Sequence, residues 1–168
     1  MGLFSKEIKS MDDLFMHTLK DIYYAENQIT KALPQMIQKA SNPQLKQGFE
    51  KHLKETEGHI RNLDQVFQKM NMEPKGVNCP AIDGIIEEAQ EIAGEVEDPK
   101  VLDAALIAAA QAVEHYEITR YGTLVTWAQE LGMHECAEIL KRNLAEEKAT
   151  DKKLTELAES RINLAAAE

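Results

Sequence analysis

The stretch QAVEHYEITRYGTL (residues 111–124) places two acids on what is otherwise the apolar face of a helix. An alanine-rich run precedes it, and its apolar residues recur at alternating steps of three and four, which is the spacing of one helical face. Glu114 and Glu117 fall on that same face. The pattern therefore predicts a long helix whose inward row carries carboxylates, and the row is Ile107, Ala110, Glu114, Glu117, Tyr121, Leu124, Ala128 and Leu131.

The composition is typical of one globular, all-helical domain. The chain has 168 residues, of which 43% are hydrophobic, 29% charged and only 5% aromatic. A net charge of −10 argues against nucleic acid and anionic membrane as partners. No basic segment followed by an apolar run opens the chain, and no apolar stretch reaches membrane-spanning length. Cys79 and Cys136 show no metal or redox spacing, so we expect a cytoplasmic protein.

Capping and helix-breaking residues divide the chain. Ser10 followed by Asp13 is typical of a capping box, Asn42 and Asp98 each precede a proline, and Gly132 ends a helix. The predicted helices are residues 11–40, 43–70, 80–96, 99–131 and 134–160, followed by a tail at 164–168 that we expect to fray. A short turn joins the first two long helices, another joins the last two, and a long crossover connects the two pairs. This pattern predicts an all-α fold, a ferritin-like four-helix bundle. It has a short extra helix in the crossover and forms a single domain over residues 1–168.

The other long helices also carry acids or histidines inside their apolar rows. Glu26 lies one heptad from Leu19 and from Leu33, at a position where leucine would be expected. The helix at 134–160 has Glu147 in the row of Leu140 and Leu154, and Asp151 in the row of Leu144 and Ala158. The helix at 43–70 has His52 and His59 in its apolar stripe, with Glu55 on the adjoining flank.

We expect four of these acids to lie at the same height along the bundle axis. Glu26, Glu55, Glu114 and Glu147 each fall near the middle of a helix, and a helix rises about 1.5 Å per residue, so parallel helices of similar length bring them together. An isolated buried carboxylate costs on the order of tens of kcal/mol by Born estimates, and no lysine or arginine lies in the stripes at this level. A single such acid would more often be exposed, protonated or structural. Four together predict two divalent metal ions, for which carboxylates and imidazoles are ligands.

Four stretches spread over nearly the whole chain are DIYYAENQI (21–29), HLKETEGHIRNLDQVF (52–67), DAALIAAAQAVEHYEITRYGTL (103–124) and EEKATDKKLTELA (146–158). They resemble the YciF-type bacterial stress proteins, relatives of ferritin and rubrerythrin. The resemblance implies a ferritin-like four-helix bundle, a homodimer, a cytoplasmic setting and a link to general stress. It implies no settled reaction.

The wider ferritin-like pattern is a glutamate on the first and third long helices and E-x-x-H on the second and fourth. Glu26, Glu114 and Glu147 match it, and Glu117 resembles the additional glutamate of rubrerythrin-like sites. Thr150 stands where the last histidine would be, with Asp151 next to it. On the second helix Glu55 is followed by His59 at a four-residue offset, the same offset that separates Glu147 from Asp151.

We therefore hypothesise a di-metal carboxylate protein that binds iron, with manganese as the alternative metal. Glu26, Glu114 and Glu117 would be terminal ligands, Glu55 and Glu147 would bridge, and His52, His59 or Asp151 would complete the coordination. If the protein is an enzyme, we expect oxidation of ferrous iron by dioxygen or peroxide. The alternatives are a non-enzymatic dimeric stress protein that acts through protein partners, and an iron-storage cage.

Overall fold

The structure, a computed structural model, describes residues 7–168, and these residues form helices and loops without a strand. The helices are α1 (Met11–Lys39), α2 (Pro43–Lys69), α3 (Pro80–Glu95), α4 (Pro99–Glu130), α5 (His134–Leu157), a π-helical turn (Ala158–Ile162) and α6 (Asn163–Ala167). Within residues 7–168, no helix combines the length and the apolarity needed to cross a lipid bilayer.

The helix ends follow the local signals. The Ser10 side chain accepts a hydrogen bond from Asp13 N, and the Asn42 and Asp98 side chains cap α2 and α4, each of which begins with a proline. After α4, Gly132 adopts a φ of +73°, a left-handed conformation that glycine takes without strain. These caps explain why α1, α2 and α4 begin where the residue pattern predicts.

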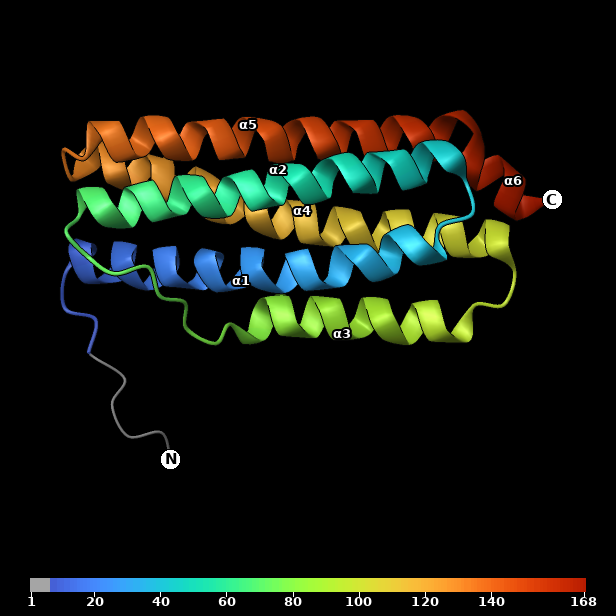
Figure 1. The fold of residues 1–168 in the computed structure, drawn as a ribbon, viewed down its shortest axis with the longest axis horizontal. Helices are drawn as coiled ribbons and strands as arrows, with labels where there is room; N and C mark the ends of the chain where they lie inside the picture. Colours follow the sequence, from blue (N-terminus) through green and yellow to red (C-terminus); the bar gives the residue numbers. More distant parts are fainter. Residues whose placement is uncertain (1–6) are drawn as a thin grey trace.

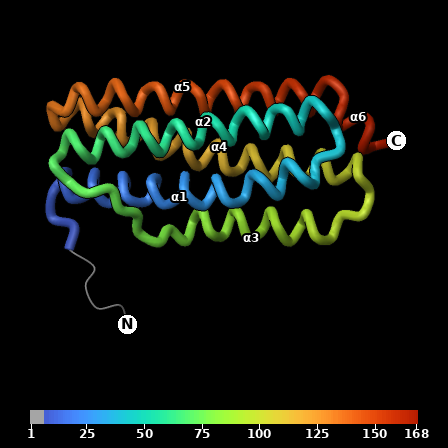
Figure 2. The backbone as a smooth tube through the Cα atoms, viewed as in Figure 1, coloured from blue at the N-terminus to red at the C-terminus, as the bar shows by residue number. Residues whose placement is uncertain are grey.

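The four long helices lie side by side along the molecule (Figures 1 and 2). α1 packs on α2, α2 on α5, α5 on α4 and α4 on α1, which closes a four-helix bundle. α3 lies outside this bundle and packs on α4 and α1, so that α4 is covered on two sides. The arrangement confirms the predicted all-α four-helix bundle with an extra helix in the crossover.

The C-terminal segment differs from the sequence prediction. Fraying was expected over residues 164–168, but helical structure continues through a π-turn and α6 as far as Ala167. Ala158 and Ile162 of the π-turn are buried, and both the π-turn and α6 contact α4. The expectation was wrong because these packing contacts, rather than the local sequence, hold the end of the chain.

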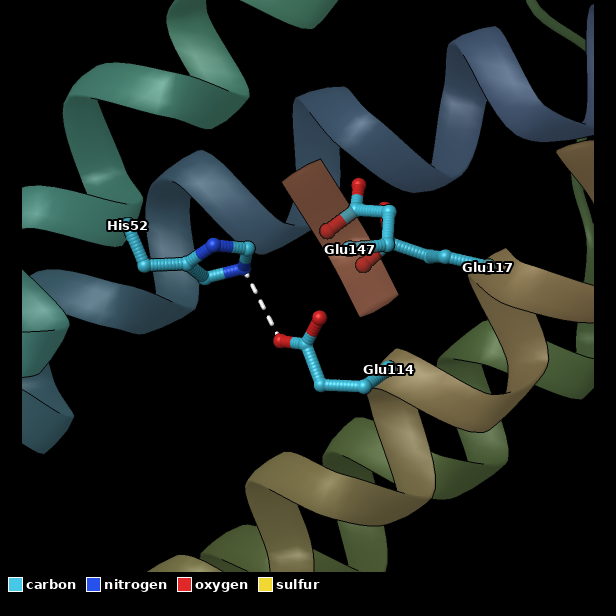
Figure 3. A group of neighbouring side chains, drawn as sticks. All are labelled: His52, Glu114, Glu117 and Glu147. Carbon is cyan, nitrogen blue, oxygen red and sulfur yellow. Dashed lines mark ion pairs between the residues drawn. The ribbon is translucent and has the colours of Figure 1, made fainter. Parts of the chain in front are cut away.

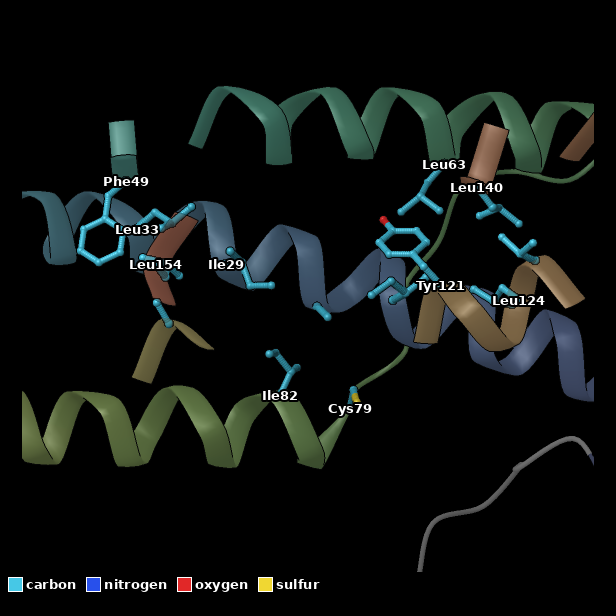
Figure 4. Close-up of a cluster of buried hydrophobic side chains, with 14 of the residues drawn as sticks. Ile29, Leu33, Phe49, Leu63, Cys79, Ile82, Tyr121, Leu124, Leu140 and Leu154 are labelled. Carbon is cyan, nitrogen blue, oxygen red and sulfur yellow. The ribbon is translucent and has the colours of Figure 1, made fainter. Parts of the chain in front are cut away.

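Apolar layers occupy the core on both sides of its midpoint (Figure 4). Phe49, Leu33 and Leu154 gather toward one end of the bundle, and Leu63, Leu124 and Leu140 gather toward the other. Each layer draws residues from several helices, so it fixes both the rotation and the height of the helix turns between the layers. The polar side chains on those middle turns are therefore held inside.

Candidate metal centre

Six ionisable side chains are buried between the two apolar layers. They come from all four long helices: Glu26 from α1, His52 and His59 from α2, Glu114 and Glu117 from α4, and Glu147 from α5. None of them exposes more than 3% of its surface. Charged residues are rarely buried to this degree unless they are paired or bind a metal.

The six side chains form two overlapping groups. His52, Glu114, Glu117 and Glu147 make one group (Figure 3), and Glu26, His59 and Glu147 make the other. In each group every residue offers one ligand atom, and these atoms lie within 4.8 Å of one another. Because Glu147 belongs to both groups, two ions held there would share its carboxylate.

Close contacts tie imidazoles to carboxylates in both groups. His52 Nε2 lies 3.0 Å from Glu114 Oε1 (Figure 3). His59 Nδ1 lies 2.9 Å from Glu147 Oε1 and 3.3 Å from Glu26 Oε1. The distances are short, but the angles at these two nitrogens do not meet the requirements of a hydrogen bond.

Many buried polar atoms of the two groups therefore have no hydrogen-bond partner. They are Glu26 Oε2, Glu114 Oε2, both carboxylate oxygens of Glu117 and of Glu147, His52 Nε2 and His59 Nδ1. Such atoms carry a desolvation penalty unless something binds them. Among residues 7–168, no lysine or arginine is buried that could neutralise the carboxylates. The donor set fits divalent ions such as iron or manganese, which bind carboxylate oxygen and imidazole nitrogen.

Other polar residues hold the candidate ligands from outside. Tyr121 OH donates a hydrogen bond to Glu26 Oε1, and Asn143 Nδ2 donates to Tyr121 OH at 3.0 Å. On the far side of the His59 ring, Nε2 lies 2.8 Å from Glu146 Oε2. A carboxylate on the second ring nitrogen commonly orients a metal-binding histidine.

The sequence analysis did not single out Asn143 or Glu146 as functional residues. Asn143 is fully buried, one turn before Glu147 on the inward face of α5, so a polar residue at that apolar position was a usable signal. Glu146 is half exposed and is indistinguishable by sequence pattern from other surface glutamates.

The structure does not bring two of the predicted ligands into either group. Glu55 is paired with Lys51 on the same helix, its side chain is 19% exposed, and its Oε2 lies 3.9 Å from His52 Nδ1. Asp151 accepts a hydrogen bond from Gln111 at 3.0 Å and lies 3.2 Å from His115. Both carboxylates sit on the flanks of their helices. Gln111 and His115 engage Asp151, whereas Lys51 engages only Oε1 of Glu55 and leaves its buried Oε2 without a hydrogen-bond partner.

The buried groups have strongly shifted pKa values. Burial alone would lower the pKa of His52, but the neighbouring carboxylates of Glu114 and Glu55, together with the negative charge of Glu147, raise it to about 10. Burial likewise opposes protonation of His59, yet Glu147 and Glu26 raise its pKa to about 11. Burial, reinforced by the charges of neighbouring carboxylates, raises the pKa of Glu117 well above its usual range. Without metal, protons therefore take the place of cations in this site.

The free energy of unfolding of the metal-free protein should fall as the pH rises from about 6.5 to about 11. Groups with raised pKa values bind more protons in the folded than in the unfolded protein, so folding becomes less favourable at higher pH. The contributions of His52 and His59 to the free energy of unfolding are fully present below about pH 6.5. They are lost as the pH rises through the pKa values of the two histidines in the folded protein. Thermal unfolding with chelator at several pH values measures this slope, and stability that rises over this range would contradict it.

The structure defines the class of the protein as an all-α four-helix bundle with a cluster of carboxylates and imidazoles buried in its core. Comparison with known proteins identifies its family. The chain belongs to the family DUF892, described as a domain of unknown function, whose family model matches residues 10–167. It is 50% identical to protein YciF of Escherichia coli strain K12 over 157 residues, which cover 93% of this chain and 95% of the relative.

Solved structures of relatives share the fold. The crystal structure of the E. coli stress protein YciF superposes with a TM-score of 0.89 and 50% identity, covering 93% of this chain and 99% of that chain. YcfI from Rhodopseudomonas palustris, described as a candidate structural protein, has a TM-score of 0.89 and 59% identity over 91% of this chain and 98% of its own. A Xanthomonas campestris protein with 21% identity and a TM-score of 0.71 covers 90% of this chain and 92% of its own, and shows the same fold.

Proposed function

We propose that this protein binds two divalent metal ions, preferentially iron, in the core of its bundle and serves a bacterial stress response. The observation that carries the proposal is the pair of ligand groups joined by Glu147, in which buried carboxylate and imidazole atoms lack hydrogen-bond partners. Glu26 and His59 would hold one ion, and His52, Glu114 and Glu117 would hold the other. Manganese is the alternative metal, because it accepts the same oxygen and nitrogen ligands.

Bound iron would supply electrons for the reduction of dioxygen or peroxide by passing from the ferrous to the ferric state. The protein's own residues would hold the ions and exclude water from them. Tyr121 and Asn143 would keep Glu26 in place, and Glu146 would orient the His59 ring. The stress role rests on similarity to E. coli YciF, 50% identical to this chain, whose crystal structure is described as that of a stress protein.

Elemental analysis of protein purified without added chelator tests the metal centre, with about two ions expected per chain. Anaerobic protein loaded with ferrous iron and desalted should then change its absorbance on addition of hydrogen peroxide, because ferric iron bound by carboxylates absorbs where ferrous iron does not. Apo-protein mixed with peroxide is the control. A desalted protein that retains no metal after ferrous loading would refute the proposal.

A dimeric stress protein that acts through protein partners is the second candidate. The positions of Glu55 and Asp151 favour it, because both carboxylates lie outside the two groups and leave fewer ligands than the residue pattern predicts. In that case the buried acids are structural, and removing them would not affect recovery of a partner from lysate. Loss of metal in the same variants would separate the first candidate from the second.

A further inference from the structure

A mainly apolar cavity of about 90 Å³ lies chiefly between α1, α3 and α4, is also lined by residues of α2 and α5, and reaches the candidate metal centre. Its wall includes Ile29, Leu33, Ile86, Leu106 and Val113. Alanines at positions 32, 89, 93, 109 and 110 also line it, and their short side chains leave the space open. The walls thus come mainly from α1, α3 and α4, with residues of α2 and α5 also lining a volume that the core does not fill.

The inner end of the cavity is formed by residues of the candidate metal centre. His52 and Glu114 line it, and each is at least 97% buried. His52 Nε2 and Glu114 Oε2 have no hydrogen-bond partner, and the two side chains face each other (Figure 3). An ion held by this group would therefore be reached from the cavity.

Thr150 also lines the cavity. Its hydroxyl is 3.4 Å from His52 Nδ1, so it touches the imidazole on the side away from Glu114. A threonine offers no imidazole or carboxylate to an ion at this position. The group of His52, Glu114, Glu117 and Glu147 consequently has room for a ligand that does not belong to the protein.

The outer end of the cavity opens between α1 and α3. Gln35, Lys39 and Gln90 are exposed wall residues there, and Lys39 Nζ donates a hydrogen bond to Ala93 O at 3.0 Å. The lysine is thus engaged with the backbone of α3, and the other two side chains are neutral. With an apolar wall beyond them, this opening favours an uncharged molecule.

We propose that the cavity binds a small, uncharged, mainly apolar molecule and holds it against the ion of the group His52, Glu114, Glu117 and Glu147. Apolar cavities of about 150 Å³ bind benzene, so this smaller cavity suits a molecule smaller than benzene, of roughly four non-hydrogen atoms. The contact with an ion rests on the proposed function, whereas the binding itself does not.

2-Fluoropropane, with four non-hydrogen atoms, is a suitable probe, and fluorine NMR of the metal-free protein should show saturable binding. The ring-proton signals of His52 should shift with the same concentration dependence, because the imidazole lines the cavity. Ala109→Leu should weaken the binding at least about tenfold by filling the cavity. Ala112→Leu is the matched control on α4, since Ala112 is exposed and outside the cavity wall, and it should leave the affinity unchanged.

Ile86→Phe on α3 fills the cavity from the opposite wall and decides the question if Ala109→Leu does not fold. Absence of saturable binding, or unchanged affinity in a folded cavity-filling variant, would overturn the proposal. With manganese bound, the fluorine signal of the bound probe should broaden strongly, and a manganese-loaded protein without broadening would also overturn it. A protein that takes up no manganese would refute the proposed metal centre, while the metal-free binding and the His52 shift would still support the cavity.

Discussion

Glu147→Gln is expected to abolish stable binding of both metal ions. Glu147 is the residue common to the two ligand groups, and both of its carboxylate oxygens are buried without a hydrogen-bond partner. Glutamine keeps the volume of the side chain but removes the charge that two cations would share. Loss of an outer residue of a metal site commonly weakens binding about 10–100-fold, so loss of this shared ligand should cost at least about 100-fold for each ion.

Glu57→Gln is the matched control for this variant. Glu57 is exposed on α2, and its replacement changes the net charge by the same amount without touching the core. Elemental analysis after desalting should find about two ions per chain in the control and less than about half an ion in Glu147→Gln. If circular dichroism shows that Glu147→Gln is folded and the variant still retains both ions, Glu147 is not a ligand shared by the two ions.

Glu117→Leu is expected to stabilise the metal-free protein while it lowers metal content. Glu117 is fully buried, neither carboxylate oxygen has a hydrogen-bond partner, and burial raises its pKa well above the usual range. Replacing buried ionic groups by apolar residues of similar volume is often neutral or stabilising by about 1–4 kcal/mol. We expect a gain in this range in chelator, together with loss of the ion next to His52.

Denaturant unfolding with and without added metal measures both effects. Wild-type protein should gain roughly 3 kcal/mol per site when metal is present at about 100 times its dissociation constant, and Glu117→Leu should gain less. Glu130→Leu at the exposed end of α4 is the control, with a change within about 0.5 kcal/mol. If Glu117→Leu destabilises the metal-free protein by several kcal/mol, Glu117 has a structural role that the contacts do not reveal.

Helical periodicity was enough to find the residues that the structure gathers in the core. Glu26, Glu114 and Glu147 replace apolar residues in heptad rows, and the apolar layers on either side carry them inward. Periodicity was not enough for Glu55 and Asp151. A flank position turns inward or outward with a small rotation of the helix, and here Lys51 and Gln111 pair with the two carboxylates near the surface.

The sequence by itself determined the helices, their caps and the presence of acids on inward faces, because these features depend on neighbours within a few turns of one chain segment. Only the tertiary structure decided which acids share a site. The place of Glu147 in both groups and the cavity that ends at His52 and Glu114 depend on the rotation and axial shift of four helices relative to one another. Those shifts are set by packing between residues far apart in the chain, which no local pattern contains.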